Sequence, residues 1–389
     1  MRVLFLTHSF PRYLGDAAGA FILRLATGLA REGVQVQVVA PATITAPPHD
    51  VIEGIPVSRF RYAPRTLETL AYEGNMASQV QASWGARVGL VGLLGAELGA
   101  ALDELRRGSF GVVHAHWWFP NGVAGAAASR WYRVPLVTTL HGSDVRLGRA
   151  IGPARPAMRQ VLQRSARVTA VSSWLAAEAR SVAGGELPMV APMPVDTERF
   201  TADPAVRRGD ALLFVGRLTK QKGVDVLLRA LAQLPPDLRL DIVGEGEERG
   251  ALERLADSLG LEARVRWHGA RLGRDLPAFY RRAAALVVPS AEEGLGLVAV
   301  EAQLCATPVI AFASGGVVDV VRDEETGLLV AERTPEALAA AISRLSARPD
   351  RGAALGQCAA GSARELFSPA HVARRYIAIY QQAIASSVR

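Results

Sequence analysis

The chain has 389 residues, of which 50% are hydrophobic, and a formal net charge of +7. Single hydrophobic cores stop growing near roughly 250 to 300 residues, so this length and composition predict two domains with separate cores. The two cysteines, Cys305 and Cys358, provide no disulfide framework, which excludes a disulfide-stapled scaffold and favours a reducing compartment.

The positive charge is concentrated in the first half of the chain. Residues 1–200 carry 20 arginines against 14 acidic residues, whereas the remainder carries 24 basic and 23 acidic residues. A basic lobe that faces an anionic membrane surface is one interpretation, and an arginine-rich proteome is the other. No nucleic-acid-binding module is recognisable, so we expect no nucleic-acid partner. The most apolar window, 88–102, is too short to span a bilayer, which predicts a cytoplasmic protein, soluble or peripheral on the inner face of the membrane.

The N-terminus predicts a strand, a polar loop and a helix. The strand covers 2–7, and the helix runs from Ala20 to Arg31 after a loop that ends at Gly19. A loop that leads into a helix N-terminus offers free amides to an anion. A second strand is expected at 34–40, and residues 42–84 are expected to be irregular, with a basic cluster at Arg59, Arg61 and Arg65.

The rest of the first lobe contains a histidine at the end of a predicted strand. Strands are expected at 112–116, 136–140, 167–172 and 189–192. His141 follows the second of these, and open α/β sheets bind ligands at the carboxyl ends of their strands. A lone histidine is more often structural, but its position at a strand end beside a glycine favours a functional role. His114 and His116 have no cysteine or carboxylate at ligand spacing, so no metal site is predicted there.

The second lobe alternates strands and helices after a polar linker at 196–210. This alternation predicts a parallel sheet covered on both faces. The six expected strands are 211–215, 239–243, 263–267, 285–288, 308–312 and 328–330. The loop 216–223 after the first of them contains Arg217 and the chain's only lysines, Lys220 and Lys222. Compact ammonium groups and a forked guanidinium suit phosphate oxygens.

The stretch 290–316 combines a glycine turn with two carboxylates. It follows an apolar strand, and Gly294 and Gly296 precede a helix whose N-terminus can receive an anion. Glu293 lies on the turn and Glu301 about one turn into the helix. Carboxylates accept hydrogen bonds from hydroxyls and repel phosphates. The expected ligand therefore carries both phosphate and sugar.

Several motifs in this order resemble the family-4 retaining glycosyltransferases, which have the two-domain GT-B fold. They are G-R-L-x-x-x-K-G at 216–223, S-x-x-E-G-x-G-x-x-x-x-E-A at 290–302, P-V-I-A at 308–311, Gly-Gly at 315–316 and E-T-G-L-L-V at 325–330. The two glutamates match the paired glutamates of that family. The resemblance extends over nearly the whole chain, although Gly19-Ala20 stands where the family usually has Gly-Gly.

The resemblance implies an α/β fold with two Rossmann-like parallel-sheet domains and an interdomain cleft. We expect an acceptor-side domain at 1–200 and a nucleotide-sugar-binding domain at 201–370. Residues 371–389 are expected to form a helix that returns to the N-terminal domain.

The resemblance also implies transfer of a hexose from a UDP- or GDP-linked sugar to a hydroxyl of a sugar or lipid-linked acceptor, with retention, in glycan, glycolipid or polysaccharide biosynthesis. Arg217 and Lys222 would neutralise the leaving diphosphate, and His141 would lie on the acceptor side. Glu293 would hold the donor sugar and Glu301 the ribose. The expected donor-binding residues are Gly19, Gly216, Arg217, Lys222, His268, Gly269, Glu293, Gly294, Leu295, Gly296, Leu297 and Glu301. The absence of any Asp-x-Asp pair predicts metal independence, and no cofactor is expected.

Two alternatives stay open. An epimerase of the same architecture would act on the nucleotide sugar without an acceptor, and a non-catalytic protein would only bind it. A phosphorylase-like reaction is disfavoured because its cofactor needs a Schiff-base lysine, and both lysines lie in the expected phosphate loop.

Overall fold

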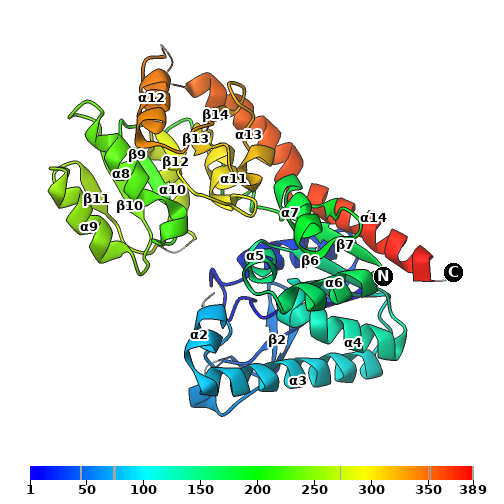
Figure 1. Cartoon of the computed structure of the whole chain (residues 1–389). Helices are drawn as coiled ribbons and strands as arrows, with labels where there is room; N and C mark the ends of the chain where they lie inside the picture. Colours follow the sequence, from blue (N-terminus) through cyan, green and yellow to red (C-terminus); the bar gives the residue numbers. More distant parts are fainter. Residues whose placement is uncertain (44–45, 73–75, 272, 349, 351, 388–389) are drawn as a thin grey trace. The chain divides into compact units, whose positions relative to one another are not determined.

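A computed structural model of the chain, which describes residues 1–43, 46–72, 76–271, 273–348, 350 and 352–387, contains two compact α/β units. Unit 1 comprises Met1–Pro194 together with Pro369–Arg389, and unit 2 comprises Val195–Ser368 (Figure 1). The boundaries expected from the sequence, after residues 200 and 370, lie close to these. Residues 195–200 go with unit 2 because the Val195 amide donates to the Phe367 carbonyl at 3.0 Å.

Unit 1 is built on an eight-stranded sheet with the order β3-β4-β2-β1-β5-β6-β7-β8. All neighbouring strands pair in parallel except β3 with β4. The strands are β1 (Arg2–Leu6), β2 (Gln35–Pro41), β3 (His49–Ile52), β4 (Ile55–Phe60), β5 (Val112–His116), β6 (Leu136–Leu140), β7 (Arg167–Ala170) and β8 (Met189–Val190). The central strands are buried along almost their whole length because both faces of the sheet are covered.

The helices of unit 1 divide between the two faces of this sheet. The crossovers from β1 to β2 and from β5 to β6 run in opposite directions, so right-handed connections place α1 and α4 on opposite faces. Helix α14 packs beside α1, and α3 packs beside α4. The helices are α1 (Ala20–Arg31), α2 (Met76–Ala82), α3 (Trp84–Arg107), α4 (Val123–Tyr132), α5 (Ser143–Ala150), α6 (Ala154–Arg164), α7 (Ser173–Ala183) and α14 (Pro369–Ser387).

The C-terminal helix α14 belongs to unit 1, as expected, although it follows unit 2 in the sequence. Its buried residues recur at helical spacing and include Tyr376 and Tyr380. The Tyr380 hydroxyl lies 2.8 Å from His114 Nδ1 in β5, and Tyr376 donates to the Ala191 carbonyl at 3.2 Å. The last helix therefore completes one face of the first sheet.

The expectation that residues 42–84 are irregular is wrong in part. The segment contains β3, β4 and α2, while residues 44–45 and 73–75 lie outside the described part. The signal that was missed is Glu53-Gly54, where φ values of 49° and 80° close a two-residue hairpin. Such turns require left-handed dihedrals, which a residue followed by glycine can provide.

The basic cluster expected in this segment is divided, because Arg59 is buried whereas Arg61 and Arg65 are exposed. Arg59 lies in β4 with only 6% of its surface exposed, and it donates to the Pro11 carbonyl and, at 3.1 Å, to the Tyr72 hydroxyl. Arg61 is paired with Glu68 at 2.6 Å. Most of this charge is therefore engaged within the domain.

Unit 2 has a six-stranded parallel sheet with the order β11-β10-β9-β12-β13-β14, and all six strands match the segments expected from the sequence. The strands are β9 (Leu212–Val215), β10 (Leu240–Val243), β11 (Val265–Trp267), β12 (Ala285–Val288), β13 (Val309–Phe312) and β14 (Gly327–Val330). When these six strands are numbered 1 to 6 in sequence order, their order in the sheet is 3-2-1-4-5-6, which is the order of a Rossmann fold. The direction of the strand order reverses between β9 and β12.

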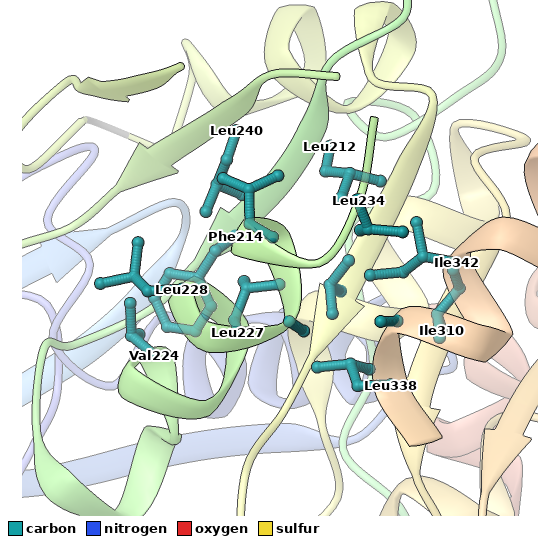
Figure 2. Close-up of a cluster of buried hydrophobic side chains, with 14 of the residues drawn as sticks. Leu212, Phe214, Val224, Leu227, Leu228, Leu234, Leu240, Ile310, Leu338 and Ile342 are labelled. Atoms are coloured by element: carbon teal, nitrogen blue, oxygen red, sulfur yellow. The ribbon is translucent and has the colours of Figure 1, made fainter. Parts of the chain in front are cut away.

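Apolar side chains from the strands and from several helices form a core cluster of this unit (Figure 2). Leu227 and Leu228 of α8 and Leu338 and Ile342 of α12 are fully or almost fully buried there, against Phe214 of β9. The helices of unit 2 are α8 (Val224–Ala232), α9 (Arg249–Ser258), α10 (Leu276–Arg282), α11 (Leu297–Leu304), α12 (Pro335–Ser346) and α13 (Ala353–Phe367). This packing fixes the strand ends from which the loops of the site emerge.

Helix α3 is long and apolar enough to cross a membrane by its length and composition. In the structure it lies along β1, β2 and β4, and its inward side is buried against the sheet. Glu97 is on that side. It is fully buried, and neither carboxylate oxygen has a hydrogen-bond partner among the described residues. Burial raises the pKa of Glu97 to about 8.

Replacing Glu97 should therefore stabilise the protein, and more so at high pH. The pKa of Glu97 is higher in the folded than in the unfolded chain, so the free energy of unfolding falls as the pH rises from about 4.5 to about 8. We expect Glu97→Met to raise this free energy by at least about 1 kcal/mol at pH 8 and by less at pH 5. Urea titrations at both pH values measure the difference. Asp103→Asn, which changes an exposed acid of the same helix, is the control. A stabilisation by Glu97→Met that does not grow with pH would contradict the raised pKa of Glu97.

Candidate functional site

The loops after β9 and β12 carry the expected phosphate- and sugar-binding residues of unit 2. These two strands are neighbours, and the strand order reverses between them. In open α/β sheets the ligand crevice lies outside the carboxyl ends of the strands at this reversal. The structure therefore brings the segments 216–223 and 289–297 to the edge where a ligand is expected.

Lys222 and Glu293 form the central contact between these loops. Lys222 Nζ donates to Glu293 Oε1 at 2.6 Å, and both side chains are mostly buried. Lys222 ends the short 3₁₀ helix Lys220–Lys222. Its side chain passes Gly216, where a Cβ would lie 4.0 Å from Lys222 Cε. A cation and a carboxylate are thus held together at the ends of two adjacent strands.

The other two cations of the loop face solvent. Arg217 and Lys220 are both exposed, and within the described residues neither side chain has a hydrogen bond or an ion pair. Arg217 is therefore available to an anionic ligand, whereas Lys222 is already paired with Glu293.

Close backbone contacts hold the two loops in register. A Cβ on Gly223, where φ is 65°, would overlap the Pro289 carbonyl oxygen. A Cβ on Gly315, where φ is 72°, would lie 2.5 Å from both the amide nitrogen and the carbonyl oxygen of Glu293. The Gly316 amide donates to the Glu293 carbonyl at 2.7 Å. Only glycine permits these approaches, and they fix the position of Glu293.

The turn before α11 leaves a helix N-terminus open. Gly296 is the N-cap with φ 89°, and no side chain caps the helix. The amides of Leu297 and Val298 donate to no acceptor within the described residues, and a helix N-terminus favours negative charge. Leu295 is buried and anchors the turn, and Gly294 continues the chain from Glu293.

Glu301 is placed one turn into α11, where it meets a residue that sequence reasoning missed. The hydroxyl of Tyr280, from α10, donates to Glu301 Oε2 at 2.8 Å. Burial raises the pKa of Glu301 to about 7, while the hydrogen bond from Tyr280 and the charge of Arg199 act in the opposite direction. One carboxylate oxygen is thus engaged, so at most the other is free for a ligand hydroxyl.

His268 and Gly269 follow β11 at the same edge of the sheet. His268 Nε2 lies 2.8 Å from Asp241 Oδ1, and its ring packs edge-on against Phe279 with centroids 4.9 Å apart. The Gly269 carbonyl accepts the Gly244 amide at 2.9 Å. The edge from β11 to β12 spans three strand spacings, about 14 Å in all, which suits an elongated ligand.

Unit 1 has its own cluster of polar side chains at the ends of β1, β5 and β6. His141 Nε2 lies 3.2 Å from His116 Nδ1, and the His141 ring packs on Trp117 with centroids 4.4 Å apart. Burial and neighbouring histidines lower the pKa values of His116 and His141 well below the ordinary range, so both rings are neutral. Asp144 accepts the Gly142 amide at 2.9 Å and thereby shapes the turn after His141.

The same cluster contains residues that the sequence did not reveal. Asn121 donates to His8 Nδ1 at 3.1 Å and to the His116 carbonyl, while its Oδ1 and His116 Nε2 are buried without a partner within the described residues. Trp117 has φ 69°, an uncommon conformation for a tryptophan that points to a functional constraint. No sequence signal indicates this dihedral.

Gly19 lies at the end of the loop after β1 in the same unit. It is the N-cap of α1 with φ 66°, and a Cβ there would overlap the Ser9 carbonyl oxygen. Glycine is therefore required by the fold of this loop, whichever ligand the helix N-terminus meets.

The comparisons with known proteins agree with this architecture. Residues 18–199 match the model of Glycosyltransferase Family 4, and residues 198–360 match that of Glycosyl transferases group 1. The chain is thus a glycosyltransferase. It is 33% identical over 402 residues to a D-inositol 3-phosphate glycosyltransferase of Xylanimonas cellulosilytica, with 95% of this chain and 93% of the relative covered. A protein of the same name from Actinosynnema mirum is 34% identical over 409 residues, with 95% of this chain and 93% of that relative covered. The chain belongs to glycosyltransferase family 4.

Solved structures show the same fold. A sucrose-phosphate synthase from Thermosynechococcus elongatus superposes with a TM-score of 0.83 at 24% identity, covering 99% of each chain. HepE from Anabaena in complex with UDP-glucose gives a TM-score of 0.73 at 23% identity, covering 98% of this chain and 99% of HepE. The two parallel-sheet units therefore have the GT-B architecture expected from the sequence.

Gly315→Ala should disrupt the site by displacing the loop that carries Glu293. The added methyl group would meet backbone atoms that cannot move aside, and alanine disfavours φ 72°. We expect the free energy of unfolding to fall by at least about 2 kcal/mol in a urea titration. Gly361→Ala, in α13 with nothing within 4 Å of the new Cβ, is the matched control. The free energy of unfolding of this control should rise by up to about 1 kcal/mol. An equal fall in both variants would contradict the close contact between Gly315 and Glu293.

Proposed function

We propose that this glycosyltransferase moves a hexose from a UDP- or GDP-linked sugar to an acceptor hydroxyl, with retention of the anomeric configuration and without a metal ion. The observation that carries the proposal is the Lys222–Glu293 pair at the reversal of strand order in unit 2. Basic groups, open amides and a carboxylate occur together there, as a ligand with both phosphate and hydroxyl groups requires. Structural neighbours crystallised with UDP-glucose, such as HepE, support a nucleotide sugar as the donor.

Lys222 and Arg217 would stabilise the leaving diphosphate. When the bond to the anomeric carbon breaks, negative charge grows on the phosphate oxygen, and cations already in place lower the barrier. Arg217 is free to fork onto two phosphate oxygens. Lys222 would turn part of its contact from Glu293 to the phosphates, which leaves the Glu293 carboxylate to accept hydroxyls of the donor sugar.

Retention would follow from attack on the same face from which the phosphate departs. In that reaction the leaving phosphate oxygen takes the proton of the acceptor hydroxyl, so no separate protein base is needed. His141 would orient the reacting sugar through a neutral ring, since its pKa is lowered by burial. Glu301 would bind the ribose through the carboxylate oxygen that Tyr280 leaves free.

The acceptor would be a polyol or sugar hydroxyl, in glycan, glycolipid or polysaccharide biosynthesis. The relatives at 33–34% identity are named for D-inositol 3-phosphate, so this compound is the first acceptor to examine. A lipid-linked sugar is the second. Activity that depends on an acceptor would distinguish a transferase from an epimerase of the same fold.

The decisive experiment measures nucleotide release from UDP- and GDP-linked hexoses with and without these acceptors, and determines the anomeric configuration of the product by NMR. We expect Lys222→Ala to lower kcat at least about 100-fold, because it removes charge that stabilises the leaving group. Arg229→Ala is the control: it removes an exposed cation of α8 that has no ion pair within the described residues and lies outside the loop 216–223, and it should change kcat less than about threefold. Similar losses in both variants, or an inverted product, would overturn the proposal.

Removing divalent metal should leave turnover within about twofold of the untreated enzyme, because Arg217 and Lys222 would do the work that a metal ion does elsewhere. The measurement is the initial rate after dialysis against EDTA, with and without added Mg²⁺ or Mn²⁺. A strict requirement for either ion would contradict leaving-group stabilisation by these two side chains.

A further inference from the structure

One layer of helices in unit 1 presents an unusual outer surface. Helices α3, α4 and α6 pack next to one another on the same side of the sheet (Figure 1). We call their outward surface the α3–α4–α6 face. It combines unpaired arginines with exposed tryptophan and valine side chains, and the proposed transfer reaction uses none of them.

The arginines gather around one hollow of about 680 Å³. It is lined by Ala127, Arg130, Trp131, Arg133 and Arg164, and so contains three guanidinium groups and no carboxylate. Within the described residues, none of these three arginines has a hydrogen bond or an ion pair. Three like charges around one hollow repel one another, and an anionic partner would relieve that repulsion.

A tryptophan projects from the middle of this cluster. Trp131 is 77% exposed, although a side chain of its size is rarely left in water. An indole ring has an apolar body and a polar N–H, and tryptophan is enriched where hydrocarbon meets headgroups. Its neighbouring arginines are placed to meet the anionic groups at such a boundary.

Helix α3 extends the apolar part of the same face. Trp84, Val88 and Val91 are 75%, 58% and 71% exposed, and their spacing of four and three residues puts them on one stripe. The opposite stripe, which includes Leu93 and Glu97, is buried against the sheet. The stripe therefore faces solvent and not the core.

Acidic side chains are almost absent from this face. The described residues of α4 and α6 include no Asp or Glu. On α3, Glu97 is buried, Glu104 is buried with the Ser58 hydroxyl donating to it at 2.6 Å, and Asp103 is engaged by Arg106 and Arg107. The net charge of the face is strongly positive.

We propose that the α3–α4–α6 face docks on a bilayer that contains anionic lipid. The arginines would contact the headgroups, while Trp131 and the α3 stripe would enter the boundary with the acyl chains. Charge complementarity selects this partner. A second copy of the chain would set this positive face against itself, and a nucleic acid would leave Trp84, Val88 and Val91 without an apolar contact.

This surface differs from the basic cluster that the sequence alone suggested. Arg59 is buried and Arg61 is paired with Glu68, so neither offers free charge to a lipid headgroup. The proposal goes beyond the transfer reaction and is tested without donor or acceptor. Its failure would therefore leave the proposed function untouched.

The test is co-sedimentation of the full chain with vesicles of phosphatidylcholine, with or without about 30% phosphatidylglycerol, at about 50 mM and about 500 mM salt. We expect binding only to the anionic vesicles, with release at high salt. The variant R130S/R133N/R164S should lower the partition coefficient by roughly 100-fold, since each basic residue near an anionic surface contributes about a factor of five. Asparagine is chosen at Arg133 because that residue has φ 55°.

A matched variant removes the same charge elsewhere. R229S/R266S/R333S replaces three exposed arginines of unit 2 that have no ion pair within the described residues, and it should bind almost as well as the wild type. W84S/V91S tests the apolar stripe and should weaken binding to anionic vesicles with the charge unchanged. Far-UV circular dichroism and thermal unfolding establish that every variant is folded.

Three results would overturn the proposal. The first is equal binding to neutral and anionic vesicles, and the second is an equal loss in both triple variants. The third is self-association measured by light scattering that W84S/V91S abolishes while vesicle binding is unchanged, which would assign the face to a second copy of the chain. Binding of a nucleic acid to this face, with no binding to anionic vesicles, would be a fourth such result and would assign the face to that partner.

Discussion

The site in unit 2 depends on how closely three backbone segments approach one another. Gly223 touches Pro289, and Gly315 touches Glu293, at distances that leave no room for a Cβ atom. These contacts connect the loops after β9, β12 and β13 across the reversal of strand order. Because these contacts hold the backbone of both loops, the carboxylate of Glu293 lies where Lys222 can reach it. The ion pair between Lys222 and Glu293 therefore depends on Gly223 and Gly315 as well as on the two charged residues.

The sequence predicted the fold well wherever a short apolar run was bounded by turn residues. All six strands of unit 2 follow this pattern, since strands covered on both faces read as continuous hydrophobic segments. The hairpin of β3 and β4 was missed because β4 contains Pro56, Ser58 and Arg59, which interrupt the apolar pattern. Arg59 can be buried because the Tyr72 hydroxyl and the Pro11 carbonyl accept hydrogen bonds from its guanidinium group. No local sequence pattern reveals such partners.

The candidate site was predicted as a set of segments but not as a set of contacts. Motif spacing placed Lys222, Glu293 and Glu301 at strand ends and on a helix start. It could not show that Tyr280 would donate to Glu301, because α10 and α11 meet only when the sheet has formed. The histidines of unit 1 are similar: the pairing of His116 with His141 needs β5 and β6 to lie side by side.

The membership of α14 in unit 1 has a consequence for synthesis on the ribosome. Unit 2 is a continuous segment, Val195–Ser368, that is inserted between the two parts of unit 1. Every residue of unit 2 is therefore made before unit 1 has its last helix, and a domain folds as a unit once its residues are available. The face of the first sheet that receives Tyr376 and Tyr380 therefore stays uncovered in the nascent chain until α14 has been made. The unit that begins the chain is thus the last to be completed.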